Sequence, residues 1–224
     1  MWVCKLFKFD EGAAYCHDDT REGLAKIARL ALHKHYPKMA TDGFEALFSR
    51  PPVIYLTSNT YLETLQFVCR QLGLPLSTIR LLRLEPEDVD AETAAQVVIE
   101  RTIQEDKAAG KMPILCVANV HSALIQGMDV CQFEAMCRRQ DVWLHLEGNA
   151  LAGLLLAKES KKEAIPTGDS MALTLGSWIG VPAVPFVTVY KVRVVVSVIR
   201  LDGLVLKMSF RSTRQLRPPQ QPPA

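Results

Sequence analysis

The sequence lacks a long hydrophobic segment and lacks closely spaced cysteines. No apolar run reaches the roughly 18–20 residues that a membrane-spanning helix needs. The N-terminus has no positive segment followed by a long apolar one, so no signal peptide is expected. The six cysteines contain no CxxC pair of the kind that holds structural zinc. We therefore expect a cytoplasmic protein with reduced thiols, no transmembrane segment and no metal site.

The sequence also has little net charge, +2 over 224 residues, so nothing global indicates a nucleic-acid partner. The charge is unevenly distributed, however. Residues 191–224 contain seven basic residues and one acid, whereas residues 1–190 carry a net charge of −4. Within this tail, Asp202-Gly203 between β-branched runs predicts a β-hairpin over residues 192–210. Residues 211–224 are rich in Pro, Gln and Arg and are expected to be disordered.

Helical and strand patterns alternate through the rest of the chain. Apolar residues at helical spacing, such as Leu24, Ile27 and Ala31, predict helices, and short apolar runs bounded by turn residues predict buried strands. The predicted helices are residues 20–35, 61–71, 90–109 and 130–140. The predicted strands are residues 53–56, 79–84, 112–118, 142–146, 169–174 and 186–190. This order indicates an α/β fold, with a mostly parallel sheet covered by helices on both faces. The ligand site of such a fold lies outside the carboxyl ends of the strands.

Four sequence landmarks fall in one order along these strands. Residues 142–148, VWLHLEG, resemble the WLHVDAA segment of group II pyridoxal-phosphate-dependent decarboxylases, and residues 169–178, DSMALTLGSW, resemble their DSxxxNxHKW segment. Residues 53–57 resemble the family's VYxS strand, and residues 113–129 match a further strand and loop in spacing. The motifs REGLAKI, QLGLP, WLHxEG and GVPAVP resemble those of a branch of this family whose members contain a pyridoxal-dependent decarboxylase domain. The resemblance implies that residues 1–191 form an incomplete large domain of the fold type I class.

The resemblance places Gly176-Ser177 where the family has a histidine and a lysine. That lysine forms an imine with the cofactor aldehyde, which a serine hydroxyl does not do. We therefore expect a catalytically inactive protein with no catalytic residue at Ser177. A lysine reaching the site from elsewhere in the chain is the alternative.

Four residues occupy family cofactor positions in degenerate form. Glu147 stands where the family has an aspartate that pairs with the pyridine nitrogen, and Tyr61 stands at the ring-stacking histidine. Ser122 keeps a hydroxyl in the loop after the third strand, and Ser170 belongs to the DS motif. The resemblance makes these four residues candidate ligands of pyridoxal phosphate. Alternatively, Glu147 is a feature of the fold whose carboxylate accepts hydrogen bonds from neighbouring donors, and Tyr61 is a core residue.

The family's phosphate-binding turn corresponds to residues 15–22, YCHDDTRE. Asp18 and Asp19 replace its glycines, which puts two carboxylates where a phosphate dianion would bind. Both aspartates also suit an ordinary helix N-terminus. Binding of pyridoxal phosphate by this chain is therefore doubtful on sequence grounds.

The family's N-terminal helical segment and small C-terminal domain have no counterpart, so we expect a truncated isoform. The family's dimer surface implies a homo-oligomer. Our leading hypothesis is an inactive decarboxylase-like protein with a binding or regulatory role. A genuine pyridoxal-phosphate-dependent carboxy-lyase acting on an amino acid is the alternative. A third hypothesis is an interaction module whose basic tail contacts anionic surfaces.

Overall fold

The computed structural model describes residues 2–57, 61–82, 91–119, 130–149, 153, 167–176 and 186–191. The hairpin predicted for residues 192–210 and the disorder predicted for residues 211–224 lie outside the described residues. Both stay predictions.

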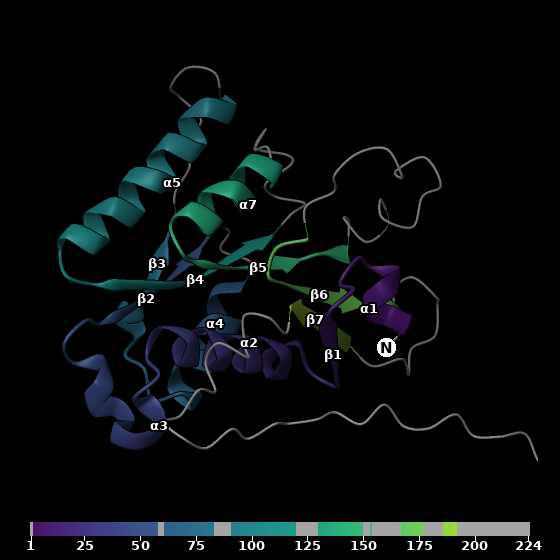
Figure 1. The fold of residues 1–224 in the computed structure, drawn as a ribbon, viewed down its shortest axis with the longest axis horizontal. Coiled ribbons are helices and arrows are strands. Elements are labelled where there is room, and N and C mark those ends of the chain that lie inside the picture. The colour runs from purple at the N-terminus through teal and green to yellow at the C-terminus, as the bar shows by residue number, and fades with distance from the viewer. Residues whose placement is uncertain are drawn as a thin grey trace, which may run out of the picture.

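A seven-stranded sheet with the order β1-β7-β6-β5-β4-β2-β3 forms the centre of the molecule (Figure 1). Strand β7 is antiparallel to both of its neighbours, β1 and β6, and the other four pairings are parallel. The prediction of a mostly parallel sheet is therefore confirmed. The strands are β1 (Gly12–His17), β2 (Pro52–Leu56), β3 (Ile79–Leu81), β4 (Met112–Asn119), β5 (Trp143–Glu147), β6 (Ser170–Thr174) and β7 (Phe186–Lys191).

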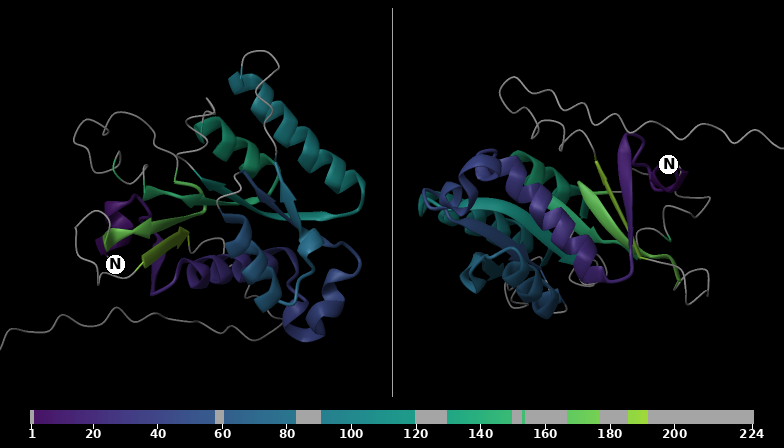
Figure 2. Two further views of the ribbon diagram at one scale, coloured as in Figure 1. Left: turned by 180° about the vertical axis from the view of Figure 1, so that it is seen from behind. Right: turned by 90° about the horizontal axis from the view of Figure 1, so that it is seen from below.

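Helices cover both faces of this sheet, as predicted. Figures 1 and 2 show α5 and α7 on one face and α2 and α4 on the other. Helix α2 forms where Gly23, Leu24, Ile27, Ala28, Ala31 and Leu32 recur at helical spacing, and all six are buried. The helical elements are α1 (Trp2–Leu6), α2 (Thr20–His35), α3 (Met39–Asp42), η1 (Gly43–Leu47), α4 (Leu62–Gln71), η3 (Leu76–Thr78), α5 (Ala91–Ala108) and α7 (Val130–Arg139).

The two layers of helices bury two separate hydrophobic clusters against the sheet. Ile99 of α5 and Phe133 of α7 belong to one cluster, and Leu24 of α2 and Leu65 of α4 belong to the other. Strands β2 and β4 contribute to both clusters, and β2 is buried along its whole length. Near-continuous apolar runs are what strands buried on both faces require, which is why these two were readable from the sequence.

Strand β1 was not predicted. Residues 15–17 were assigned to a phosphate-binding turn, but they form the second half of β1 and pair with β7 through Tyr15↔Thr188, Cys16↔Val187 and His17↔Phe186. The sequence of β1, GAAYCH, lacks a clear alternation of apolar and polar residues. The strand is half-buried along most of its length, so neither of its faces requires a row of large apolar residues. The turn into α2 is consequently limited to Asp18 and Asp19.

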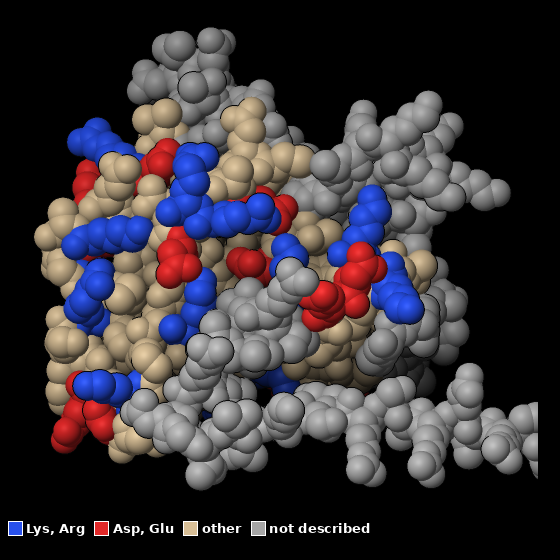
Figure 3. Space-filling view, viewed as in Figure 1, with Lys and Arg blue, Asp and Glu red and all other residues tan. Residues whose placement is uncertain are grey.

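Surface properties agree with a protein that has no strong net charge. Figure 3 shows basic and acidic side chains interspersed on the face that it presents. In the described part of the chain, no helix is both long and apolar enough to cross a membrane. All six cysteines are free; Cys16 and Cys131 are exposed and the other four are buried.

Candidate functional site

The candidate site lies at the carboxyl edge of the parallel strands, where the fold predicts it. Tyr61 follows β2 and begins α4, and Glu147 is the last residue of β5. Strand β4 lies between β2 and β5, and Asn119 at its end is the register partner of Glu147. Residues far apart in the sequence therefore meet at one edge of the sheet.

The structure brings Tyr61 and Glu147 together. Burial, the Glu147 charge and a hydrogen bond to its carboxylate raise the pKa of Tyr61 to about 12. The phenol therefore stays protonated at neutral pH and donates its proton to the carboxylate. The Glu147 side chain is only 11% exposed, so this hydrogen bond compensates much of its burial. Two predicted cofactor ligands are thus partners of each other.

His145 lies behind Glu147, two residues earlier on the same face of β5. Its Nδ1 is 2.8 Å from the Ser170 hydroxyl, which also accepts a hydrogen bond of 2.8 Å from the Trp143 indole. Its Nε2 is 3.6 Å from a Glu147 oxygen and has no hydrogen-bond partner in the described part of the chain, although His145 is fully buried. This chain of polar groups connects the sheet interior to the Glu147 carboxylate.

A second buried polar atom without a partner lies at the same edge. Thr57 directly follows β2 and is 4% exposed, and its hydroxyl makes no hydrogen bond to any residue that the structure describes. Unpaired buried atoms are uncommon because each one costs about 1–3 kcal/mol. Thr57 and His145 therefore mark the carboxyl edge as a place where the fold leaves hydrogen-bonding capacity unused.

Gly148 follows Glu147 and has no space for a side chain. A Cβ atom built there would lie 2.2 Å from Cγ and 2.4 Å from Sδ of Met171. Met171 on β6 is fully buried, so its side chain fills the space beside the backbone of Gly148. The alanine that the decarboxylase family has at this position would displace Met171.

The turn between β1 and α2 is held by its own side chains. The Asp19 carboxylate caps α2 by accepting a hydrogen bond of 2.9 Å from the Arg21 amide. The His17 ring bonds to the Asp19 carbonyl at 2.7 Å and to the Thr188 hydroxyl at 2.9 Å. Both nitrogens of His17 and one free amide of the helix are therefore used within the protein. This confirms the interpretation of Asp19 as an ordinary helix cap.

Close packing supports this turn. A Cβ atom on Gly23 would lie 2.5 Å from both His17 Nε2 and Thr188 Oγ1, so glycine lets α2 approach the His17–Thr188 pair. The His17 ring also stacks with the rings of Tyr15 and Phe186. The turn is consequently a packed part of the β1–β7 edge.

The remaining predicted residues divide into those that the structure describes and those outside the described residues. Ser170 is fully buried, and its hydroxyl contacts the Trp143 indole and the His145 ring. Gly176 ends the described segment after β6, and Ser122 and Ser177 lie outside the described residues. The role of Ser170 in binding a cofactor stays a prediction, as do those of Tyr61, Glu147 and Ser122.

His145 and Met171 were missed by the sequence analysis. His145 is two residues before Glu147 in a predicted strand, so the two-residue period of a strand placed both side chains on one face. The sequence therefore contained a signal that His145 lies next to Glu147. Nothing in the sequence indicated that Met171 would fill the space beside Gly148, because the two residues are on different strands.

The comparisons with solved structures define the fold class. Mouse CSAD matches with a TM-score of 0.66 and 17% identity, covering 84% of this chain and 39% of that chain. A crystal structure of Oryza sativa TDC with PLP and tryptamine matches with a TM-score of 0.63 and 15% identity, covering 92% and 44%. At these identities the likeness shows the fold. The chain has the large-domain fold of the pyridoxal-phosphate-dependent fold type I decarboxylases and covers part of it.

The sequence comparison identifies closer relatives. The pyridoxal-dependent decarboxylase domain-containing protein 1 of Xenopus laevis is 40% identical over 193 residues, which cover 85% of this chain and 25% of that protein. No model of a known protein family matches the chain. The chain is homologous to the pyridoxal-phosphate-dependent decarboxylase-like proteins, and it spans about a quarter of the length of this relative.

Proposed function

We propose that this chain is a non-catalytic member of the decarboxylase-like proteins with a binding or regulatory role. One observation carries the proposal: Ser177 stands where the resemblance places the imine-forming lysine. A serine hydroxyl does not supply the nitrogen that the family's chemistry requires. The decarboxylase chemistry of the relatives therefore does not transfer to this chain.

The described residues do not fit pyridoxal phosphate, the cofactor that the family implies. Asp19 uses its carboxylate to cap α2, and Asp18 adds a second negative charge to the same turn. A phosphate dianion there would face like charges. The Glu147 carboxylate, which would pair with a ring nitrogen, instead accepts the Tyr61 hydrogen bond. Both changes support a site that has lost its cofactor.

Reduction with borohydride in the presence of pyridoxal phosphate tests this proposal. After proteolysis, mass spectrometry is expected to find no cofactor attached to residues 176–178 and no stoichiometric adduct on any lysine. The Ser177→Lys variant provides the matched control for detection of an adduct at that position. A stoichiometric adduct on one lysine of the unmodified chain would support the alternative, a genuine carboxy-lyase acting on an amino acid.

Restoring the histidine and lysine is not expected to restore the reaction. The variant Gly176→His with Ser177→Lys still carries Asp18 and Asp19 in the turn, so its affinity for the cofactor phosphate stays low. We expect no decarboxylation of aromatic or acidic amino acids by this double variant. Carbon dioxide release above the level of the unmodified chain would show that the rest of the site is functional.

We also propose that the protein self-associates and resides in the cytoplasm. Large apolar side chains are exposed on the described surface, including Phe48 at 78% and Val97 at 59%. Contiguous exposed apolar area favours association. Six free thiols support a reducing compartment. Size-exclusion chromatography with light scattering tests the first statement, and a monodisperse monomer at high concentration would contradict it.

A further inference from the structure

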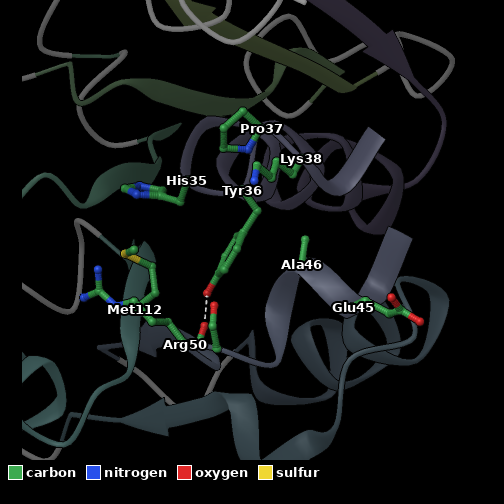
Figure 4. Close-up of a pocket in the computed structure, with 9 residues that line it drawn as sticks. His35, Tyr36, Pro37, Lys38, Glu45, Ala46, Arg50 and Met112 are labelled. Atoms are coloured by element: carbon green, nitrogen blue, oxygen red, sulfur yellow. Dashed lines mark hydrogen bonds between the residues drawn. The ribbon is translucent and has the colours of Figure 1, made fainter. Parts of the chain in front are cut away.

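A pocket of about 330 Å³ lies at the amino edge of the sheet, the edge opposite to Glu147. It is formed where α2 ends at His35 and where β2 and β4 begin, and Met112 is the first residue of β4. Figure 4 shows Tyr36 in the middle of the pocket, between His35 and Met112 on one side and Lys38 and Ala46 on the other. Its volume is at the lower end of the range for small-molecule sites.

The walls of the pocket are fixed by the fold. Tyr36 is 6% exposed and its hydroxyl donates a hydrogen bond to the Arg50 carbonyl, which holds the ring in place (Figure 4). Pro37, Ala46 and Met112 add apolar surface beside the ring. A ligand with a flat apolar part would contact this surface without a rearrangement of the backbone.

Two basic residues, Lys38 and Arg50, line the pocket. Among the residues that the structure describes, neither Lys38 nor Arg50 forms an ion pair, and the Arg50 guanidinium donates to the Lys111 carbonyl at 3.3 Å. Lys34 nearby is different, because it contacts Asp141 at 2.6 Å. Glu45 is the one acidic residue of the lining, so the charge of the lining is net positive.

His35 adds a buried polar atom without a partner. Its side chain is 6% exposed and its Nδ1 is 3.9 Å from an Asp141 oxygen, whereas its Nε2 makes no hydrogen bond within the described ranges of the chain. Burial, together with the charge of Lys34, lowers the pKa of His35 to about 4, so the ring is neutral at pH 7. A neutral imidazole nitrogen donates or accepts a hydrogen bond, according to its tautomer. This unused capacity belongs to a residue that lines the pocket.

We propose that this pocket binds a small organic carboxylate with an apolar, flat body. The apolar body packs on Tyr36 and Met112, the carboxylate is attracted by Lys38 and Arg50, and His35 supplies a neutral polar contact. The site is independent of the carboxyl edge and of the proposed loss of decarboxylase activity. It lies at the edge opposite to the one where ligands of open α/β sheets generally bind.

Titration with benzoate and with its neutral counterpart benzamide tests the proposal. In ¹⁵N-resolved NMR spectra of the full chain, benzoate is expected to shift amide signals of residues 35–38, 45–50 and 112. We expect benzoate to bind about tenfold more tightly than benzamide, the factor that corresponds to one favourable charged contact. Equal affinity of the two compounds, or shifts that map elsewhere, would overturn the proposal.

Charge-removing variants sharpen this test. Lys38→Gln and Arg50→Gln are each expected to weaken benzoate binding about three- to tenfold and to leave benzamide binding unchanged. Lys5→Gln removes the same charge from an exposed position of α1 and is expected to have no effect. Inorganic phosphate that displaces benzoate at equal concentration would contradict the requirement for an apolar body. Unchanged benzoate affinity in both pocket variants would also refute the assignment.

Discussion

Two tyrosines near β2 face carboxylates, and their environments differ. Tyr55 in β2 is fully buried and donates a hydrogen bond of 2.9 Å to Asp106, which also contacts Arg80 at 2.6 Å and Lys111 at 3.1 Å. Tyr61 after β2 is half-buried and donates to Glu147, which has the unpartnered nitrogen of His145 at 3.6 Å. The carboxylate of Asp106 is thus saturated with hydrogen-bond donors, whereas the group of polar side chains around Glu147 still includes an atom without a partner among the described residues.

The difference separates a saturated buried carboxylate from the carboxylate of the candidate site. Burial alone would raise the pKa of Asp106, but the hydrogen bonds from Arg80, Lys111 and Tyr55 outweigh it and hold that pKa below its ordinary value. Asp106 therefore links α5 to the sheet and has no capacity left for a ligand. Glu147 lies where the fold places ligands and keeps unused polar neighbours. The comparison teaches that burial of a carboxylate alone does not mark a site.

The largest expected effect comes from removing the saturated carboxylate. Asp106→Ala leaves Arg80 and the Tyr55 hydroxyl without their partner, and we expect the free energy of unfolding to fall by about 3–5 kcal/mol. Glu147→Ala is expected to cost about 1 kcal/mol, since it removes one hydrogen bond. Urea unfolding followed by circular dichroism measures both. Equal losses would break the comparison between the two centres.

Acid pH is expected to destabilise the protein through His35. Like His145, this residue is buried and has a ring nitrogen without a hydrogen-bond partner among the described residues. The pKa of His35 is lowered from 6.5 to about 4 in the folded state, so the unfolded state binds the proton more tightly. The stabilisation is complete above pH 6.5 and is lost as the pH falls from 6.5 to 4, by about 3 kcal/mol. Urea unfolding across this pH range measures the slope. The His35→Phe variant, which does not titrate, should flatten it; an unchanged slope would assign the effect to other groups.

The two tyrosines allow a matched substitution. Tyr55→Phe leaves the buried Asp106 with one partner fewer and is expected to cost about 2 kcal/mol, whereas Tyr61→Phe is expected to cost about 1 kcal/mol. Double-mutant cycles with Asp106→Asn and Glu147→Gln give the coupling energy of each pair. A larger coupling for Tyr61–Glu147 than for Tyr55–Asp106 would reverse the order of the two centres.

The smallest expected effect concerns the cap of α2. Asp19→Ala removes the acceptor of the Arg21 amide and is expected to lower the free energy of unfolding by about 1 kcal/mol. Asp18→Ala is the control, because the cap contact is made by Asp19. Thermal unfolding measures both. If the cost came from Asp18 instead, the assignment of the cap would be wrong.

Most elements were predictable because their periodicity is strong. Helix α2 begins and ends at the residues that its apolar spacing and Asp19 predicted. Strand β4 extends one residue beyond its predicted end, and β5 is shifted by one residue at both ends. The part of the candidate site that could be predicted followed from resemblance and from strand order, which put Tyr61 and Glu147 at one edge. Strand β1 could not be predicted because it is stabilised by pairing with β7, from Gly12↔Lys191 to His17↔Phe186. The paired residues are at least 169 positions apart in the sequence, so no local pattern indicates the pairing.

The sequence by itself determined the alternation of helices and strands and the likeness to the decarboxylase fold, and it is the basis for the proposal that Ser177 replaces the imine-forming lysine. These depend on local periodicity and on the identity of single residues. Only the tertiary structure decided which polar groups meet: Tyr61 with Glu147, Tyr55 with Asp106, and His35 with the pocket at the amino edge. The physical reason is that hydrogen bonds and burial depend on distances between side chains that chain neighbours do not fix.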